Sequence, residues 1–257
     1  MAETRLHTET LGSSDSRFVF LHGLFGRGRN WASIARNLQP HCSVLVDLPN
    51  HGLSPWSPKF SYLDMVADVV QVLAELGQPA CLVGHSMGGR VAMLTALHHP
   101  DLVDRLVIVD TSPGLIPTDR LRTVAQAMSK VDMSTVTSRS QVRRILARNI
   151  DDELVVGFLL QNLTRDIHHH WSWTLNLDVL NRDIELVGEW PETSASYCHP
   201  TLFITGAQSD HDVGDLTNVK KLFPLMRQVK VKQAGHWVHA DAPEVVTEAL
   251  RHFVAET

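Results

Sequence analysis

The chain has 257 residues, of which 44% are hydrophobic, and its formal net charge at pH 7 is −5. This length and composition suit one large α/β domain or two small ones with a sizeable core. The acidic balance and the lack of any lysine or arginine block exclude the electrostatic signature of a nucleic-acid-binding protein.

The sequence also shows little sign of a membrane-spanning segment or of a disulfide framework. No apolar run approaches the ~18 residues that a membrane-spanning helix needs, and the opening segment MAETRLHTETLG is polar. We therefore expect a cytoplasmic protein without stable membrane insertion. Cys42, Cys81 and Cys198 form neither a CxxC pair nor an even disulfide set. The sequence carries no sign of an oligomeric state.

Short apolar runs that end in Gly, Pro or Asn are typical of buried strands in a parallel sheet. Residues 5–12 fit an opening edge strand. The runs that fit buried strands are, in chain order, 17–23, 43–49, 80–86, 105–110, 201–206 and 228–235.

Helical patterns separate these runs. The clearest is 61–76, where Ser61 and Asp64 form a start signal and Gly77 ends the pattern. Its apolar stripe consists of Val66, Val69, Val70, Leu73 and Leu76. A second helix is expected over 86–99, because Pro100 stops it. Alternating strands and helices predict an α/β fold with a doubly wound, mostly parallel sheet.

One segment departs from this alternation. Between about 115 and 190 the strand-like runs disappear, and weak helical stripes take over at 121–131 and 141–163. We interpret 115–190 as a helical cap, or lid, over the carboxyl edge of the sheet. Residues 1–114 and 191–257 then form the α/β core.

The motif GHSMGG follows the apolar run ACLV and places Ser86 between Gly84 and Gly88. In a G-x-S-x-G turn the serine hydroxyl sits above the end of a strand, and the next residue's N–H faces an oxyanion. The motif alone could be a glycine-rich turn. Its context favours a site, because a parallel sheet gathers the loops HGLFG, DLPNHGLSP, DTSPG, GAQSD and AGHWVHAD around the same crevice.

Together, HGLFG, NHGLSP, GHSMGG and GHWVHAD resemble the α/β-hydrolase superfamily, in particular its short-chain acyl esterase and thioesterase branch of bacterial and mitochondrial proteins. The resemblance implies a hydrolase of carboxylic esters or thioesters that needs no metal or organic cofactor. It makes Ser86 the nucleophile and His236 the base. The backbone N–H groups of Leu24 and Met87 are the expected oxyanion donors, with Phe25 as the alternative to Leu24.

The acid that orients the histidine should lie between serine and histidine in chain order. We favour Asp110, which ends LVIVD, then Asp210 in GAQSD, then Asp178 in the cap. The family's usual spacing after the glycine of GAQSD falls on Ser209, which could bond the histidine.

The substrate walls are expected from bulky residues near the crevice. These are Phe25, Leu159, Leu160, Trp171 and Trp173, and their bulk favours short or medium acyl chains. The consecutive residues 168–170 are all histidines, which is the wrong spacing for metal ligands on one helical face, so no metal site is expected.

Two other functions fit the same sequence. One is non-esterolytic chemistry on this fold, such as C–C bond hydrolysis or cofactor-free haloperoxidase activity, since fold does not fix function. The other is a non-catalytic binding protein that keeps the triad. Epoxide hydrolase and dehalogenase chemistry is disfavoured, because those relatives carry aspartate where this chain has Ser86.

Overall fold

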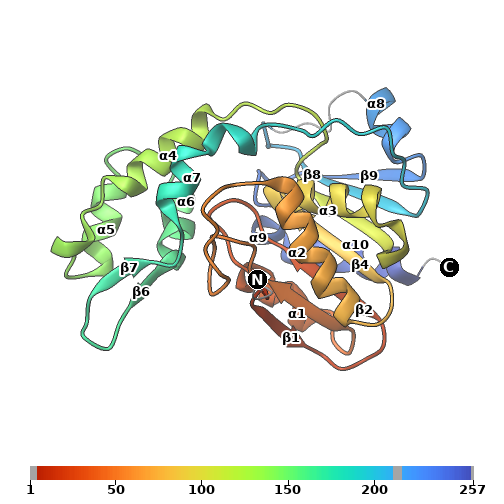
Figure 1. Cartoon of the computed structure of the whole chain (residues 1–257), viewed down its shortest axis with the longest axis horizontal. Helices are drawn as coiled ribbons and strands as arrows, with labels where there is room; N and C mark the ends of the chain where they lie inside the picture. Colours follow the sequence, from red (N-terminus) through yellow and green to blue (C-terminus); the bar gives the residue numbers. More distant parts are fainter. Residues whose placement is uncertain (1–4, 211–215, 256–257) are drawn as a thin grey trace.

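A seven-stranded sheet lies at the centre of the computed structural model, which describes residues 5–210 and 216–255 (Figure 1). The strand order is β1-β3-β2-β4-β5-β8-β9. Strand β1 runs antiparallel to β3, and every other neighbouring pair is parallel. The strands are β1 (Thr8–Leu11), β2 (Arg17–Leu21), β3 (Cys42–Val46), β4 (Ala80–His85), β5 (Val103–Val109), β8 (Thr201–Gly206) and β9 (Met226–Val231). The predicted fold class is confirmed.

The sheet separates the core into two apolar clusters, and helices cover each of them. The first cluster includes Val69 and Val91 and is covered by α2 (Tyr62–Glu75), α3 (Met87–His98) and α8 (Leu216–Leu222). The second includes Ile34 and Leu250 and is covered by α1 (Ala32–Asn37), α9 (Val238–Asp241) and α10 (Pro243–Ala255). Short 3-10 turns span Gly28–Trp31, Pro100–Leu102, Met133–Thr135, Leu160–Asn162 and Ile184–Val187.

The two predicted helices of the core are confirmed. The Ser61 hydroxyl accepts the Asp64 N–H at 3.2 Å and so caps α2. The last strand differs from the expectation, because β9 lies at 226–231 and its residues 227–230 are exposed. This strand lies at the edge of the sheet and pairs with β8 alone. The expectation of a buried strand was therefore wrong for this segment.

Between β5 and β8 the chain forms a lobe to one side of the sheet, at the left of Figure 1. Its helices are α4 (Asp119–Ser129), α5 (Arg139–Leu146), α6 (Glu153–Leu159) and α7 (Leu177–Arg182). Two features were not expected. The stripe 141–163 breaks into α5 and α6 because Asp152 accepts the Leu154 N–H and caps a new helix. A hairpin also forms, with strands β6 (Leu163–Arg165) and β7 (Trp171–Trp173).

Arg90 on α3 joins this lobe to the core. Its buried guanidinium donates to the carbonyls of Ser112 and Gly114 at the start of the lobe, and to those of Gly188 and Glu189 at its end. One side chain therefore ties both connections of the lobe to the helix that follows Ser86. Across 5–210 and 216–255, none of the helices has the length and apolar character needed to cross a membrane.

Candidate active site

Ser86 occupies a sharp turn between β4 and α3. Its φ of 51° and ψ of −120° are rare for a residue with a side chain, and such strain is found mostly at functional sites. A Cβ on Gly84 would lie 2.3 Å from the Gly88 carbonyl oxygen, and one on Gly88 would lie 2.4 Å from that of His22. The motif needs both glycines because backbone crosses backbone on each side of the serine.

His236, in the loop between β9 and α9, connects the serine to an acid. Its Nε2 atom lies 3.1 Å from Ser86 Oγ, and its Nδ1 atom lies 2.8 Å from Asp110 Oδ2. Asp110 directly follows β5 and is fully buried. These contacts have the geometry of a Ser–His–Asp triad.

The other two candidate acids do not contact His236, although Asp210 lines the same cavity. The Asp210 side chain is 93% exposed and lies 3.8 Å from Arg120. Asp178 is an exposed residue of α7 and lines a different pocket. The structure thus brings Asp110, and neither alternative, to His236.

Two neighbours fix the Asp110 carboxylate. Its Oδ1 atom accepts the Gly206 N–H at 2.8 Å, and its Oδ2 atom accepts the Ser209 hydroxyl at 2.5 Å. Ser209 therefore contacts the acid rather than the histidine. One donor is the last residue of β8 and the other lies in the loop that follows, so the end of β8 orients an acid that follows the neighbouring strand β5.

The oxyanion side of the site lies between α3 and the loop after β2. Leu24, Phe25 and Met87 all line the cavity beside Ser86. The Phe25 N–H donates to Nε2 of His51 at 3.2 Å, so this amide is already engaged. Of the two amides considered for this loop, the geometry thus favours that of Leu24. The sequence analysis gave His51 no role in the site.

Three histidines around the site are buried and neutral. Burial lowers the pKa of His22 to about 4 and the pKa values of His51 and His239 to about 3. A fourth, His85, bonds the backbone carbonyl of His236 through Nε2 at 2.8 Å. These rings serve as scaffold around the triad.

A cavity of about 340 Å³ opens beside Ser86. Its walls come from both the core and the lobe, and they are mainly apolar. The lobe side consists of Ile116, Pro117, Asp119, Arg120, Leu121, Val124, Val155, Phe158, Leu159 and Val187. Several of these recur at helical spacing, such as Val155, Phe158 and Leu159 on α6, and that periodicity was the signal that could have found them.

Three of the expected wall residues do not line this cavity. Leu160 is fully buried in the core, and Trp171 and Trp173 lie on the β6–β7 hairpin. Trp173 lines a separate pocket together with Trp56. The sequence expectation is corrected here, because the hairpin places the tryptophans outside the lining of this cavity, whereas Phe25 and Leu159 do line it.

The fold and these contacts define a class: a doubly wound α/β protein with a Ser–His–Asp constellation at a strained strand-to-helix turn. The chain belongs to the α/β hydrolase family, whose model matches residues 18–249. This confirms the family expected from the motifs.

Named relatives and a solved structure show which kind of α/β hydrolase the chain is similar to. The chain is 38% identical over 247 residues to the mouse protein named sn-1-specific diacylglycerol lipase ABHD11, covering 92% of this chain and 80% of the relative. It is 32% identical to esterase YbfF of Escherichia coli, covering 97% of each. A solved marine microorganism esterase superposes with a TM-score of 0.94 at 30% identity, covering 98% of this chain and 100% of that one. The chain is thus a hydrolase of the esterase type.

Proposed function

We propose that this protein is a serine esterase that cleaves carboxylic esters, and also acyl-thioesters, of short to medium acyl chains through an acyl-enzyme on Ser86. The single observation that carries the proposal is the continuous contact from Ser86 through His236 to Asp110 at the wall of an apolar cavity. Residues 115–190 act as its cap.

The geometry assigns a role to each group. Ser86 Oγ attacks the substrate carbonyl carbon while His236 Nε2 takes the hydroxyl proton. The resulting oxyanion is stabilised by the N–H groups of Leu24 and Met87. The bond from the carbonyl carbon to the leaving oxygen, or sulfur in a thioester, then breaks as His236 returns the proton to that atom. Water, deprotonated by His236, attacks the acyl-enzyme carbonyl; the bond to Ser86 Oγ then breaks as His236 gives the proton to Oγ, and the carboxylic acid is released.

The acyl chain lies in the cavity between core and cap. Its apolar walls, including Val124, Val155 and Phe158, favour a hydrocarbon chain, and its volume of about 340 Å³ limits that chain to short or medium length. Small-molecule esters are therefore the proposed substrates.

A panel of p-nitrophenyl esters and acyl-thioesters of graded chain length tests the proposal, with wild type and Ser86→Ala assayed side by side. We expect Ser86→Ala to lose several orders of magnitude in kcat while its melting temperature stays close to that of the wild type. Covalent labelling of the wild type by an alkyl fluorophosphonate, absent in the variant, would be seen by mass spectrometry. Wild-type rates in the alanine variant would refute the assignment.

A further inference from the structure

Phe25 lies in the left-handed region, with a φ of 59°, although it carries a large side chain. It is the third residue of a turn that the Gly26 N–H closes onto the Gly23 carbonyl at 2.9 Å. Such a position normally favours glycine. A strained residue of this kind persists only where its surroundings fix it.

Both polar groups of the Phe25 backbone are fixed. Its N–H donates to His51 Nε2 at 3.2 Å, and its carbonyl accepts Asn162 Nδ2 at 2.7 Å. His51 and Asn162 are themselves fully or almost fully buried. One anchor comes from the core and the other from the lobe, and they act on opposite ends of the same residue.

His51 is prepared as an acceptor. Its Nδ1 atom donates to the Pro49 carbonyl at 2.9 Å, which leaves Nε2 without a proton and able to accept the Phe25 N–H. His22 is arranged in the same way. Its Nδ1 atom donates to the Gly23 carbonyl at 2.8 Å and its Nε2 atom accepts the Leu48 N–H at 3.0 Å.

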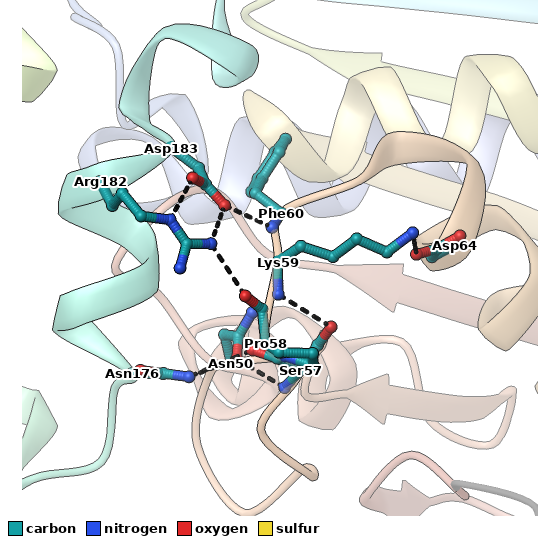
Figure 2. A network of polar contacts seen from close by, with 9 residues as sticks. All are labelled: Asn50, Ser57, Pro58, Lys59, Phe60, Asp64, Asn176, Arg182 and Asp183. Atoms are coloured by element: carbon teal, nitrogen blue, oxygen red, sulfur yellow. Dashed lines mark hydrogen bonds and ion pairs between the residues drawn. The ribbon is translucent and has the colours of Figure 1, made fainter.

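The lobe also supports the loop that carries His51. Figure 2 shows this contact: Asn176 Nδ2 donates to Asn50 Oδ1 at 3.0 Å, and Asp183 accepts the Phe60 N–H at 3.0 Å. Arg182 adds a bond to the Pro58 carbonyl at 2.8 Å. Both anchors of Phe25 therefore depend on contacts with the lobe.

The same part of the lobe forms the wall of the cavity. Asn162 ends the 3-10 turn Leu160–Asn162, which directly follows α6, and Leu159 at the end of α6 lines the cavity. A second bond joins Asn162 Nδ2 to the Leu159 carbonyl at 3.3 Å. The wall that would contact the acyl chain and the turn that contains Leu24 are thus connected through one asparagine.

We propose that His51 and Asn162 are positioning residues for the oxyanion turn, residues 23–26: by fixing Phe25 from both sides they direct the preceding Leu24 N–H at the oxyanion. This inference rests on the proposed esterase function. Without the anchors the strained turn relaxes, and the Leu24 amide no longer faces the oxygen that develops charge.

Three variants and a control test the proposal. His51→Leu removes the acceptor at similar volume, whereas His51→Gln keeps an acceptor oxygen near the position of Nε2. Asn162→Ala removes the contact to the Phe25 carbonyl. Arg143→Gln is the control, because it removes an exposed ion pair with Glu153 within the lobe and touches neither Phe25 nor its anchors. For each folded protein, kcat and KM are measured with p-nitrophenyl butyrate, and the inhibition constant is measured with an aryl trifluoromethyl ketone, whose serine adduct places an oxyanion in the hole.

We expect His51→Leu to lose about 10- to 100-fold in kcat, and Asn162→Ala about 10-fold, with KM changed by less than about threefold, because a misdirected oxyanion donor affects the transition state and not substrate binding. Affinity for the ketone should fall in the same proportion. His51→Gln should recover most of the lost kcat, and Arg143→Gln should stay within about twofold of wild type.

Other outcomes would overturn the proposal. Folded His51→Leu and Asn162→Ala enzymes with normal kcat and ketone affinity would do so, as would a loss confined to KM or a His51→Gln enzyme no better than His51→Leu. Should His51→Leu fail to fold, the Asn162→Ala and His51→Gln results decide the question. A wild-type protein that neither cleaves the ester nor binds the ketone would instead refute the proposed function.

Discussion

The Oδ2 atom of Asp110 lies 2.8 Å from Nδ1 of His236 and also accepts the hydroxyl of Ser209. The other carboxylate oxygen accepts the Gly206 N–H. In Asp110→Asn the amide oxygen would stay with Gly206, so the NH₂ group would face His236 and donate to Nδ1. That reverses the tautomer, and Nε2 then carries a proton and cannot accept one from Ser86.

Asp110→Asn should therefore lose about 10³- to 10⁴-fold in kcat. Asp210→Asn is the matched control, and its rate should stay near that of wild type because its side chain is 93% exposed. Steady-state kinetics at neutral pH, with circular dichroism to confirm folding, would measure both. Near-normal turnover in a folded Asp110→Asn enzyme would remove Asp110 from the mechanism.

A second prediction concerns chain length. Phe158→Ala should enlarge the cavity and raise kcat/KM for a six-carbon ester relative to a four-carbon ester by up to about tenfold, since each buried methylene contributes ~0.8 kcal/mol. Trp173→Ala is the control, because Trp173 does not line this cavity. It should lower the melting temperature but leave the chain-length profile unchanged. A shifted profile in the Trp173 variant alone would restore the hairpin as the substrate wall.

The serine turn could be predicted from the sequence because its cause is local. Gly84 is required by its close approach to the Gly88 backbone within the same turn, and the flanking strand and helix are read from apolar periodicity. Gly88 is required by the His22 carbonyl from a distant segment, but the motif itself already contains this glycine. Chain order alone could not select the acid. Asp110 and Asp210 both follow strands, and what separates them is the direction of two loops in space.

The cavity walls and the positioning residues were harder to predict from the sequence than the acid. The bulk of Trp171 and Trp173 suggested a wall, but bulk says nothing of the direction in which a hairpin turns. His51 and Asn162 are far apart in the sequence, and both bond the backbone of Phe25. No pattern within one segment reports such a contact.

The lowered pKa values of the buried histidines lead us to expect that the protein loses stability in acid. Burial lowers the pKa of His22 to about 4 and those of His51 and His239 to about 3, against ~6.5 in an unfolded chain. Between these values the unfolded chain binds protons that the folded chain does not. The free energy of unfolding is therefore unaffected above about pH 6.5 and falls below it, by up to ~1.4 kcal/mol per pH unit for each histidine.

Urea denaturation at intervals between about pH 7 and pH 5 would measure this slope. His239→Gln should make the slope shallower by about one histidine's share, whereas His168→Gln, at an exposed position, should leave it unchanged. A slope that is the same in wild type and His239→Gln would show that this ring does not contribute.

Arg90 offers the last prediction, which concerns how the lobe is attached. Its guanidinium donates to carbonyls at both ends of the lobe, including those of Ser112 and Gly114, while being almost inaccessible to solvent. Arg90→Met would leave several buried carbonyls without a donor, and each such group costs ~1 to 3 kcal/mol. We expect the free energy of unfolding to fall by about 3 kcal/mol or more. Arg90→Lys should recover little, because a single ammonium cannot reach both connections.

The matched control is Arg143→Met, which removes a solvent-exposed ion pair with Glu153 and should cost less than about 1 kcal/mol. Chemical denaturation of the three variants gives the comparison, and limited proteolysis locates the effect. Because Arg90 binds the connections of the lobe, cleavage in Arg90→Met should begin within residues 115–190 before the core unfolds. Equal stability of Arg90→Met and Arg143→Met, with proteolysis unchanged, would show that the lobe is attached mainly by its own apolar packing.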